Sequence, residues 1–146
     1  MPVNGGWSLL ECMEHLRRYM EVYISEIQKA IHKGQTSHQS SYRTGWLGNY
    51  FAQSMLPNQK RSKKMKTFKS KNPKGVALES SVLQDVGTQL KKMKEFLGAA
   101  QDIDWNRTRV KTTLGPWNKF KLGDIFRFVI YHNLRHFEQA RRIHES

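Results

Sequence analysis

The sequence is poor in cysteine, because Cys12 is the only one among its 146 residues. A lone cysteine cannot form an internal disulfide. The chain also has no run of about twenty apolar residues, so we expect no membrane-spanning segment. Residues 1–6 show neither the basic nor the apolar region of a secretory signal. These absences together lead us to expect a cytoplasmic protein.

The signature motifs of several enzyme classes are missing as well. We find no internal repeat, no Gly-rich phosphate loop, no Cys-x-x-Cys pair and no serine in a nucleophile-elbow context. No segment has the alternating pattern of a half-buried strand; apolar residues recur instead at intervals of three and four. We therefore predict an all-α fold, an antiparallel helical bundle, and treat residues 1–146 as a single domain.

Four segments have the apolar periodicity of amphipathic helices. Ser8 and Glu11 have capping-box spacing and begin the first helix, which Gly34 ends. The connection over residues 101–121 has no clear period and contains two tryptophans, so we expect an ordered connection. The predicted helices cover residues 9–31, 46–55, 78–97 and 122–143.

Acidic residues are scarce, and the formal net charge is +13. Between residues 59 and 74 the chain has eight lysines and arginines and no acid. We interpret this stretch as an exposed, mobile loop. A basic run of this kind can also contact phosphate groups or acidic surfaces.

Two histidines, His132 and His136, lie four residues apart within the last predicted helix. This spacing places both rings on one helix face, among apolar residues that we expect to face inward. Buried rings need polar partners, and either one shared metal ion or hydrogen bonds to other core side chains would satisfy them. A metal ion would need a third ligand from a facing helix. His15 is the natural candidate, since no other histidine lies inside another long amphipathic helix. A metal ion held by three imidazoles, with its remaining coordination positions open to water, is typical of catalytic sites. Such ligands suit zinc, nickel, copper or iron.

The two ends of the sequence resemble those of a known family. Residues 6–16, GWSLLECMEHL, and residues 122–139, LGDIFRFVIYHNLRHFEQ, are similar to the paired end motifs of DinB-like bundles, including the YfiT-like branch. The resemblance implies a four-helix bundle in which His15, His132 and His136 hold a divalent metal. It also implies that a low-molecular-weight thiol is a candidate cosubstrate, because some relatives are metal-dependent thiol transferases or isomerases.

The beginning of this chain departs from the family pattern. Members of the family usually carry a complete helix before the Trp-Ser motif, and here only residues 1–6 precede it. We therefore expect the first helix to be missing or replaced. A bundle without one helix exposes an apolar groove, so we also expect the chain to form a homodimer.

From these observations we predict a divalent-metal-dependent enzyme that acts on a small molecule, either a thiol-dependent S-transferase or a hydrolase. The alternative, which we favour less, is a non-catalytic protein that binds nucleic acid or another polyanion through residues 59–74. Glu11 either orients His15 or only caps its helix. No catalytic residue is assigned beyond the metal ligands, and the further pocket candidates are Tyr19, Arg109, Tyr131, Asn133 and Arg135.

Overall fold

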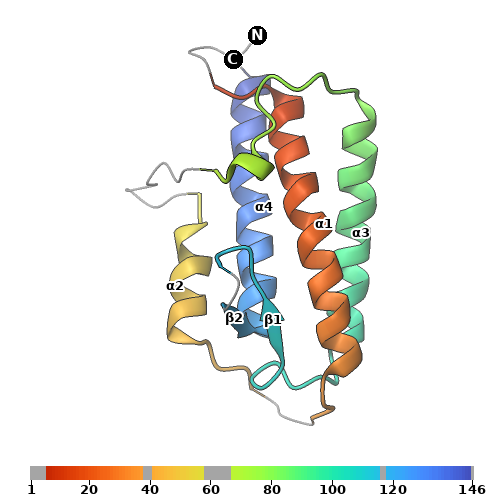
Figure 1. Ribbon diagram of the computed structural model, residues 1–146, viewed down its shortest axis with the longest axis vertical. Coiled ribbons are helices and arrows are strands. Elements are labelled where there is room, and N and C mark those ends of the chain that lie inside the picture. Colours follow the sequence, from red (N-terminus) through yellow and green to blue (C-terminus); the bar gives the residue numbers. More distant parts are fainter. Residues whose placement is uncertain (1–5, 38–40, 58–66, 116–117, 146) are drawn as a thin grey trace.

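The computed structural model describes residues 6–37, 41–57, 67–115 and 118–145 (Figure 1). These residues form four α-helices, one short 3₁₀ helix and one small β-hairpin. In chain order the elements are α1 (Leu9–Lys33), α2 (Trp46–Ser54), η2 (Lys69–Lys71), α3 (Ser81–Ala99), β1 (Arg109–Lys111), β2 (Lys119–Lys121) and α4 (Leu122–His144). The predicted helical bundle is confirmed. The hairpin is a correction, because we predicted no strand.

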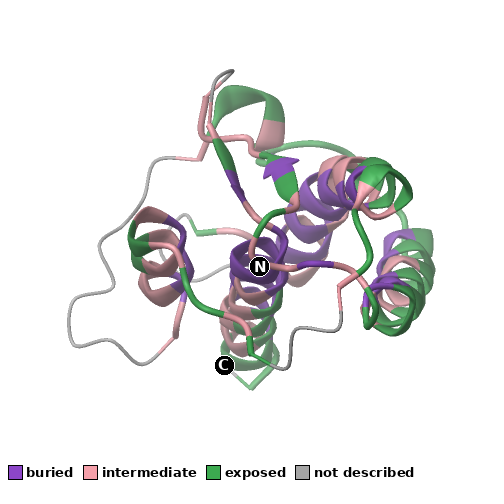
Figure 2. Cartoon of the chain, turned by 90° about the horizontal axis from the view of Figure 1, so that it is seen from below, coloured by how far each residue is buried: buried purple, intermediate pink, exposed green. Residues whose placement is uncertain are grey.

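Two central helices carry most of the core. α1 packs against both α3 and α4, and α2 packs against α4 (Figure 1). Figure 2 shows the buried residues gathered on α1 and α4, whereas α3 is largely exposed. Among the most deeply buried side chains are Leu16, Tyr23 and Ile27 of α1 and Ile125 and Phe126 of α4. No described helix is long and apolar enough to span a membrane.

The start of α1 is fixed by reciprocal hydrogen bonds. The Glu11 backbone N–H donates to Ser8 Oγ at 3.2 Å, and the Ser8 N–H donates to the Glu11 carboxylate at 2.7 Å. The same carboxylate accepts a third bond, from the Gly75 N–H at 2.7 Å. Glu11 therefore acts as the predicted cap, and its carboxylate also attaches the chain after η2 to α1.

A buried carboxylate holds α2 against α4. Asp124, in the first turn of α4, is 1% exposed and accepts hydrogen bonds from the Tyr42 hydroxyl and the Gly45 N–H. At Gly48 of α2 a Cβ atom would overlap the Asp124 side chain. The close packing of α2 on α4 therefore requires glycine at this position.

The connection between α3 and α4 is ordered around Trp105 and the hairpin. The Trp105 indole donates to the Ala100 carbonyl at 2.7 Å, and its ring lies 5.2 Å from that of Phe126. β1 and β2 pair antiparallel, with Val110 opposite Phe120 and both facing the core. The second tryptophan of this connection lies outside the described residues.

Only part of the basic stretch, residues 67–74, belongs to the described chain. Its Lys71 ammonium donates to the Arg18 carbonyl at 2.9 Å, and the Arg18 guanidinium donates to the Asn72 carbonyl at 3.2 Å. Pro73 is buried, although Phe68 and Lys69 are exposed. The prediction of an exposed loop is therefore wrong at Pro73, and Lys71 is half-buried, whereas Asn72 is exposed as predicted. The backbone carbonyls of Lys71 and Asn72 accept hydrogen bonds from side chains of α1. Residues 59–66 lie outside the described chain.

Candidate metal centre

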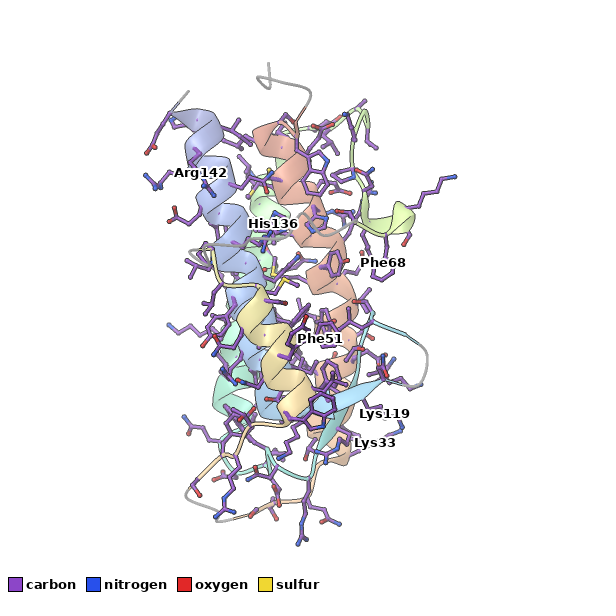
Figure 3. All side chains as sticks on the ribbon, turned by 90° about the vertical axis from the view of Figure 1, so that its left-hand side faces the viewer. Lys33, Phe51, Phe68, Lys119, His136 and Arg142 are labelled. Atoms are coloured by element: carbon purple, nitrogen blue, oxygen red, sulfur yellow. The ribbon has the colours of Figure 1, made fainter. Side chains whose placement is uncertain are left out.

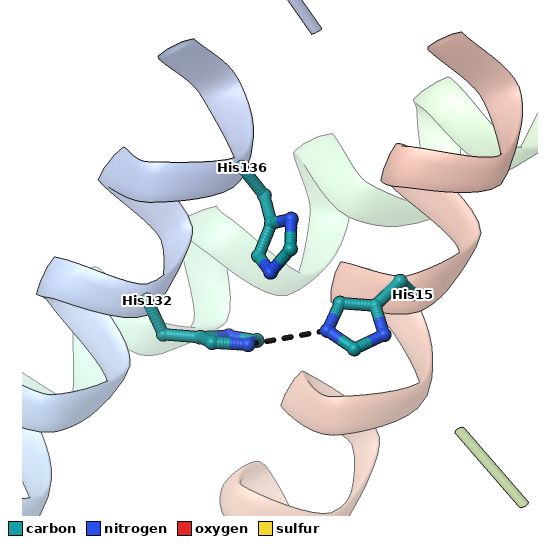
Figure 4. A group of neighbouring side chains, drawn as sticks. All are labelled: His15, His132 and His136. Carbon is teal, nitrogen blue, oxygen red and sulfur yellow. Dashed lines mark hydrogen bonds between the residues drawn. The ribbon is translucent and has the colours of Figure 1, made fainter. Parts of the chain in front are cut away.

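The structure brings together the three histidines that the sequence singled out. His15 reaches inward from α1, and His132 and His136 reach inward from α4 (Figure 4). One nitrogen from each ring lies within 4.8 Å of the others, and the Nε2 atoms of His15 and His132 are 3.2 Å apart. The three residues are only 3%, 6% and 8% exposed, so their rings depend on each other and on the protein for polar contacts.

Hydrogen bonds to the outer ring nitrogens fix how two of these histidines are protonated. His15 Nδ1 lies 2.9 Å from the Lys71 carbonyl, and His136 Nδ1 lies 3.0 Å from Gln139 Oε1. A carbonyl oxygen only accepts, so each Nδ1 carries the proton and donates it. The Nε2 atoms of His15 and His136 therefore carry lone pairs, and that of His15 accepts a hydrogen bond from His132 Nε2–H at 3.2 Å. This arrangement, with the outer nitrogen held by a carbonyl, is common behind metal-binding histidines.

Burial keeps all three rings neutral. Loss of hydration, together with the positive charges of Arg18 and Lys71, lowers the pKa of His15 to about 4, against the opposing effect of the Lys71 carbonyl. Burial likewise lowers the pKa of His136 to about 3. The pKa of His132 falls well below its ordinary value because of burial and because the neighbouring histidines would repel a second positive charge. A neutral imidazole is the form that binds metal.

The donor set fits a transition metal of the zinc type. Two nitrogens bound to one tetrahedral zinc at about 2.0–2.1 Å lie about 3.3–3.4 Å apart, close to the observed His15–His132 separation of 3.2 Å. Imidazoles suit zinc, nickel and iron, whereas calcium and magnesium require oxygen ligands. Cys12 is not part of this cluster; it is buried, and burial raises the pKa of its thiol to about 12.

A cavity of about 440 Å³ opens onto the three rings. Trp7 covers one side of the histidines, with its ring 4.7 Å from that of His15 and 5.9 Å from that of His136. Among the described residues, the wall contains the three neutral histidines, two cationic side chains, Lys74 and Arg135, and no carboxylate. Its apolar part consists of Trp7, Met55, Phe68, Leu114 and Phe128.

The additional candidates from the sequence divide into two groups. Tyr19 and Arg135 line the cavity, and the Tyr19 ring lies 4.8 Å from those of both His15 and His132. The other three do not line it. Asn133 donates to the Met20 sulfur within the core, Tyr131 lies beneath the Arg127 guanidinium, and Arg109 belongs to β1.

Three contributors to the site were not predicted. Gln139 follows His136 by three residues, so helical spacing alone could have indicated it. Trp7 precedes the first helix, where periodicity gives no direction for a side chain. Lys71 contributes its backbone carbonyl, which carries no residue-type signal, and it lies 56 positions from His15 in the chain.

These features define a helical bundle in which two central helices present a candidate three-histidine metal centre at the base of an open cavity. The chain belongs to the DinB superfamily, whose family model matches residues 1–140. No curated protein and no solved structure matches the sequence.

Proposed function

We propose that this protein is a divalent-metal-dependent enzyme that acts on a small molecule bound beside the three histidines. The supporting observation is the position of three neutral imidazoles at the base of an open cavity. A closed structural zinc site has four protein ligands, whereas catalytic sites combine three with an open position. The described residues contain no fourth histidine, cysteine or carboxylate in this cluster.

A zinc, nickel or iron ion held by these residues would act as a Lewis acid and lower the pKa of a bound water or thiol. The protein's own groups prepare this chemistry. The Lys71 carbonyl and Gln139 keep the Nδ1 protons in place, so that the free nitrogens face inward. Trp7 and Phe128 pack beside the rings and give this part of the cavity an apolar surface.

The wall of the cavity favours an anionic, partly apolar substrate. Arg135 and Lys74 would attract a carboxylate or a similar group, and the aromatic side chains would cover an apolar part. The described wall offers no Asp or Glu side chain as a general base. Burial raises the pKa of Tyr19 to about 12, so its hydroxyl stays protonated. These features favour a reaction whose nucleophile is activated by the metal, either transfer of a low-molecular-weight thiol to an electrophile or hydrolysis.

Metal content provides the direct test. We expect the purified protein to hold about one transition-metal ion per chain, and the variant H15A/H132A/H136A to hold almost none. The variant H32A/H144A removes two exposed histidines and serves as a matched control that keeps its metal. Full occupancy in the triple variant would refute the assignment. A panel of low-molecular-weight thiols with an electrophilic acceptor, assayed with these variants, then tests the transfer reaction.

We also propose that the chain forms a homodimer. α2 has 9 residues against 23 in α4, so it covers only part of the length of α4. Ile130, Leu134 and Phe137 share one face of α4 and are 42%, 44% and 37% exposed. Pairing two copies through this face would bury the stripe, and two-fold dimers are the commonest assembly.

A further inference from the structure

A second cavity, of about 510 Å³, lies between the last turns of α1, the chain before β1 and the hairpin. Of the described residues that line it, one is acidic, Glu26, which pairs with Lys29 at 2.6 Å. Figure 3 shows Lys33 and Lys119 together at the end of the molecule away from His136. We call this cavity the basic cleft, and its cationic residues are Lys29, Lys33, Arg107, Arg109, Lys111 and Lys119.

The hairpin places like charges directly opposite each other. Its register sets Arg109 against Lys121 and Lys111 against Lys119, on the face opposite to the buried Val110–Phe120 pair. Like charges in such cross-strand pairs destabilise a sheet. The Lys121 ammonium donates to the Arg43 carbonyl at 2.9 Å and does not line the cleft, whereas Lys111 and Lys119 both line it.

The structure provides little internal compensation for these charges. Among the described residues, no ion pair forms at Lys33, Arg109, Lys111 or Lys119. Arg107 lies 3.9 Å from Asp104, at the limit of an ion pair. Several unpaired cations on a concave surface concentrate positive potential and attract a ligand that carries several negative charges.

We infer that the basic cleft binds the phosphate backbone of double-stranded nucleic acid without reading its sequence. Cations spread over a helix end and a hairpin can contact several phosphates at once, as backbone binding requires. The described residues that line the cleft include no aromatic side chain, whereas proteins that bind single strands stack bases on aromatic rings. This activity goes beyond the proposed enzyme function, and it uses different residues from the run at 59–74.

A pair of charge-matched variants tests the inference. The hairpin variant K111E/K119E and the control K91E/K94E, on the exposed face of α3, change the net charge by the same amount. Binding to a fluorescent duplex of about 20 base pairs is measured by anisotropy from about 50 to 200 mM salt. The logarithm of the binding constant falls with the logarithm of the salt concentration by about 0.9 per phosphate contact, so each contact strengthens binding about 15-fold at about 50 mM salt relative to about 1 M. We therefore expect the hairpin variant to bind about 15-fold more weakly at about 50 mM salt for each contact that it loses. We expect the control variant to bind like the wild-type protein.

A single substitution separates weakened binding from loss of folding. Lys111→Glu converts the pair with Lys119 into opposite charges, so the melting temperature should equal or exceed that of the wild-type protein while duplex binding weakens. Metal content should remain unchanged, because this substitution is far from the histidines.

Three results would overturn the inference. The first is equal loss of binding in K111E/K119E and K91E/K94E, which would indicate a net-charge effect with no localised site. The second is displacement of the duplex by single-stranded DNA or inorganic triphosphate at the same phosphate concentration, which would indicate another kind of ligand. The third is the absence of duplex binding by the wild-type protein at about 50 mM salt.

Discussion

Metal binding to this protein should release almost no protons at a pH of about 6. A histidine with the ordinary pKa of 6.5 is roughly three-quarters in its imidazolium form at that pH. Three such ligands would therefore release roughly 2.3 protons when a metal ion binds in place of the protons. In this site burial lowers the pKa of His15 to about 4 and that of His136 to about 3. At pH about 6 these two rings are then roughly 1% protonated or less, and burial also lowers the pKa of His132 well below its ordinary value, which favours its neutral form.

Calorimetry measures this quantity directly. Zinc is titrated into metal-free protein in two buffers of different ionisation enthalpy at the same pH, and the difference in heat gives the number of protons released. We expect a value close to zero for the wild-type protein and for the control variant H32A, whose substituted ring is exposed. Release of about two protons would refute the reasoning, because it would mean that the rings are solvated and charged in the free protein.

The same shifts give the metal-free protein a defined pH dependence. The folded-state pKa values lie below the unfolded value of 6.5, so the unfolded chain binds more protons as the pH falls. The stability contributed by neutral His15 and His136 is therefore fully present above pH 6.5 and is lost progressively towards pH about 4 and about 3. Urea denaturation of the metal-free protein across this range would show the decline.

Three further predictions concern packing and assembly. Gly48→Ala should lower the free energy of unfolding by about 1–3 kcal/mol, because a Cβ atom overlaps Asp124; an unchanged urea midpoint would contradict this. Arg18→Ala should weaken zinc binding several-fold without altering a ligand. The substitution removes the hydrogen bond to the Asn72 carbonyl, which holds the neighbouring Lys71 carbonyl in position to orient His15. Zinc affinity equal to the wild-type value would show that Arg18 does not position this segment. Light scattering over a dilution series should show a dimer that strengthens with salt, since salt screens charge repulsion, and Leu134→Lys should shift it towards monomer; an unaltered dimer would exclude the α4 stripe as the interface.

The elements that could be predicted from the sequence are those with short-range signals. The long helices repeat their apolar residues every three or four positions, and the capping box marked the start of α1 within one residue. His132 and His136 were placed on one face because four residues complete little more than one helical turn. The prediction of His15 as the third ligand required only the further inference that two amphipathic helices turn their apolar faces towards each other.

The features that escaped prediction depend on contacts between distant segments. Each strand of the hairpin has three residues and buries only one of them, Val110 or Phe120, which is too short to show an alternating pattern. The basic cleft gathers cations from three separate segments, whereas the contiguous run at 59–74 was conspicuous in the sequence. The position of residues 71–73 against α1 depends on backbone carbonyls, which every residue possesses.

The two sites occupy opposite ends of one rigid element, and this arrangement determines how they can interact. His15 lies near the start of α1, and Lys29 is fourteen residues further along the same helix. At about 1.5 Å per residue the two positions are about 21 Å apart along the axis, more than twice the screening length of about 8 Å at physiological salt. The charge of a metal ion at the buried histidines therefore acts only weakly, at this distance, on the cations of the basic cleft, which are exposed to solvent and salt. Coupling between the sites would require α1 itself to move, and its contacts with both α3 and α4 along the bundle oppose that. A bound duplex should consequently leave zinc affinity unchanged, and by thermodynamic reciprocity zinc should leave duplex affinity unchanged.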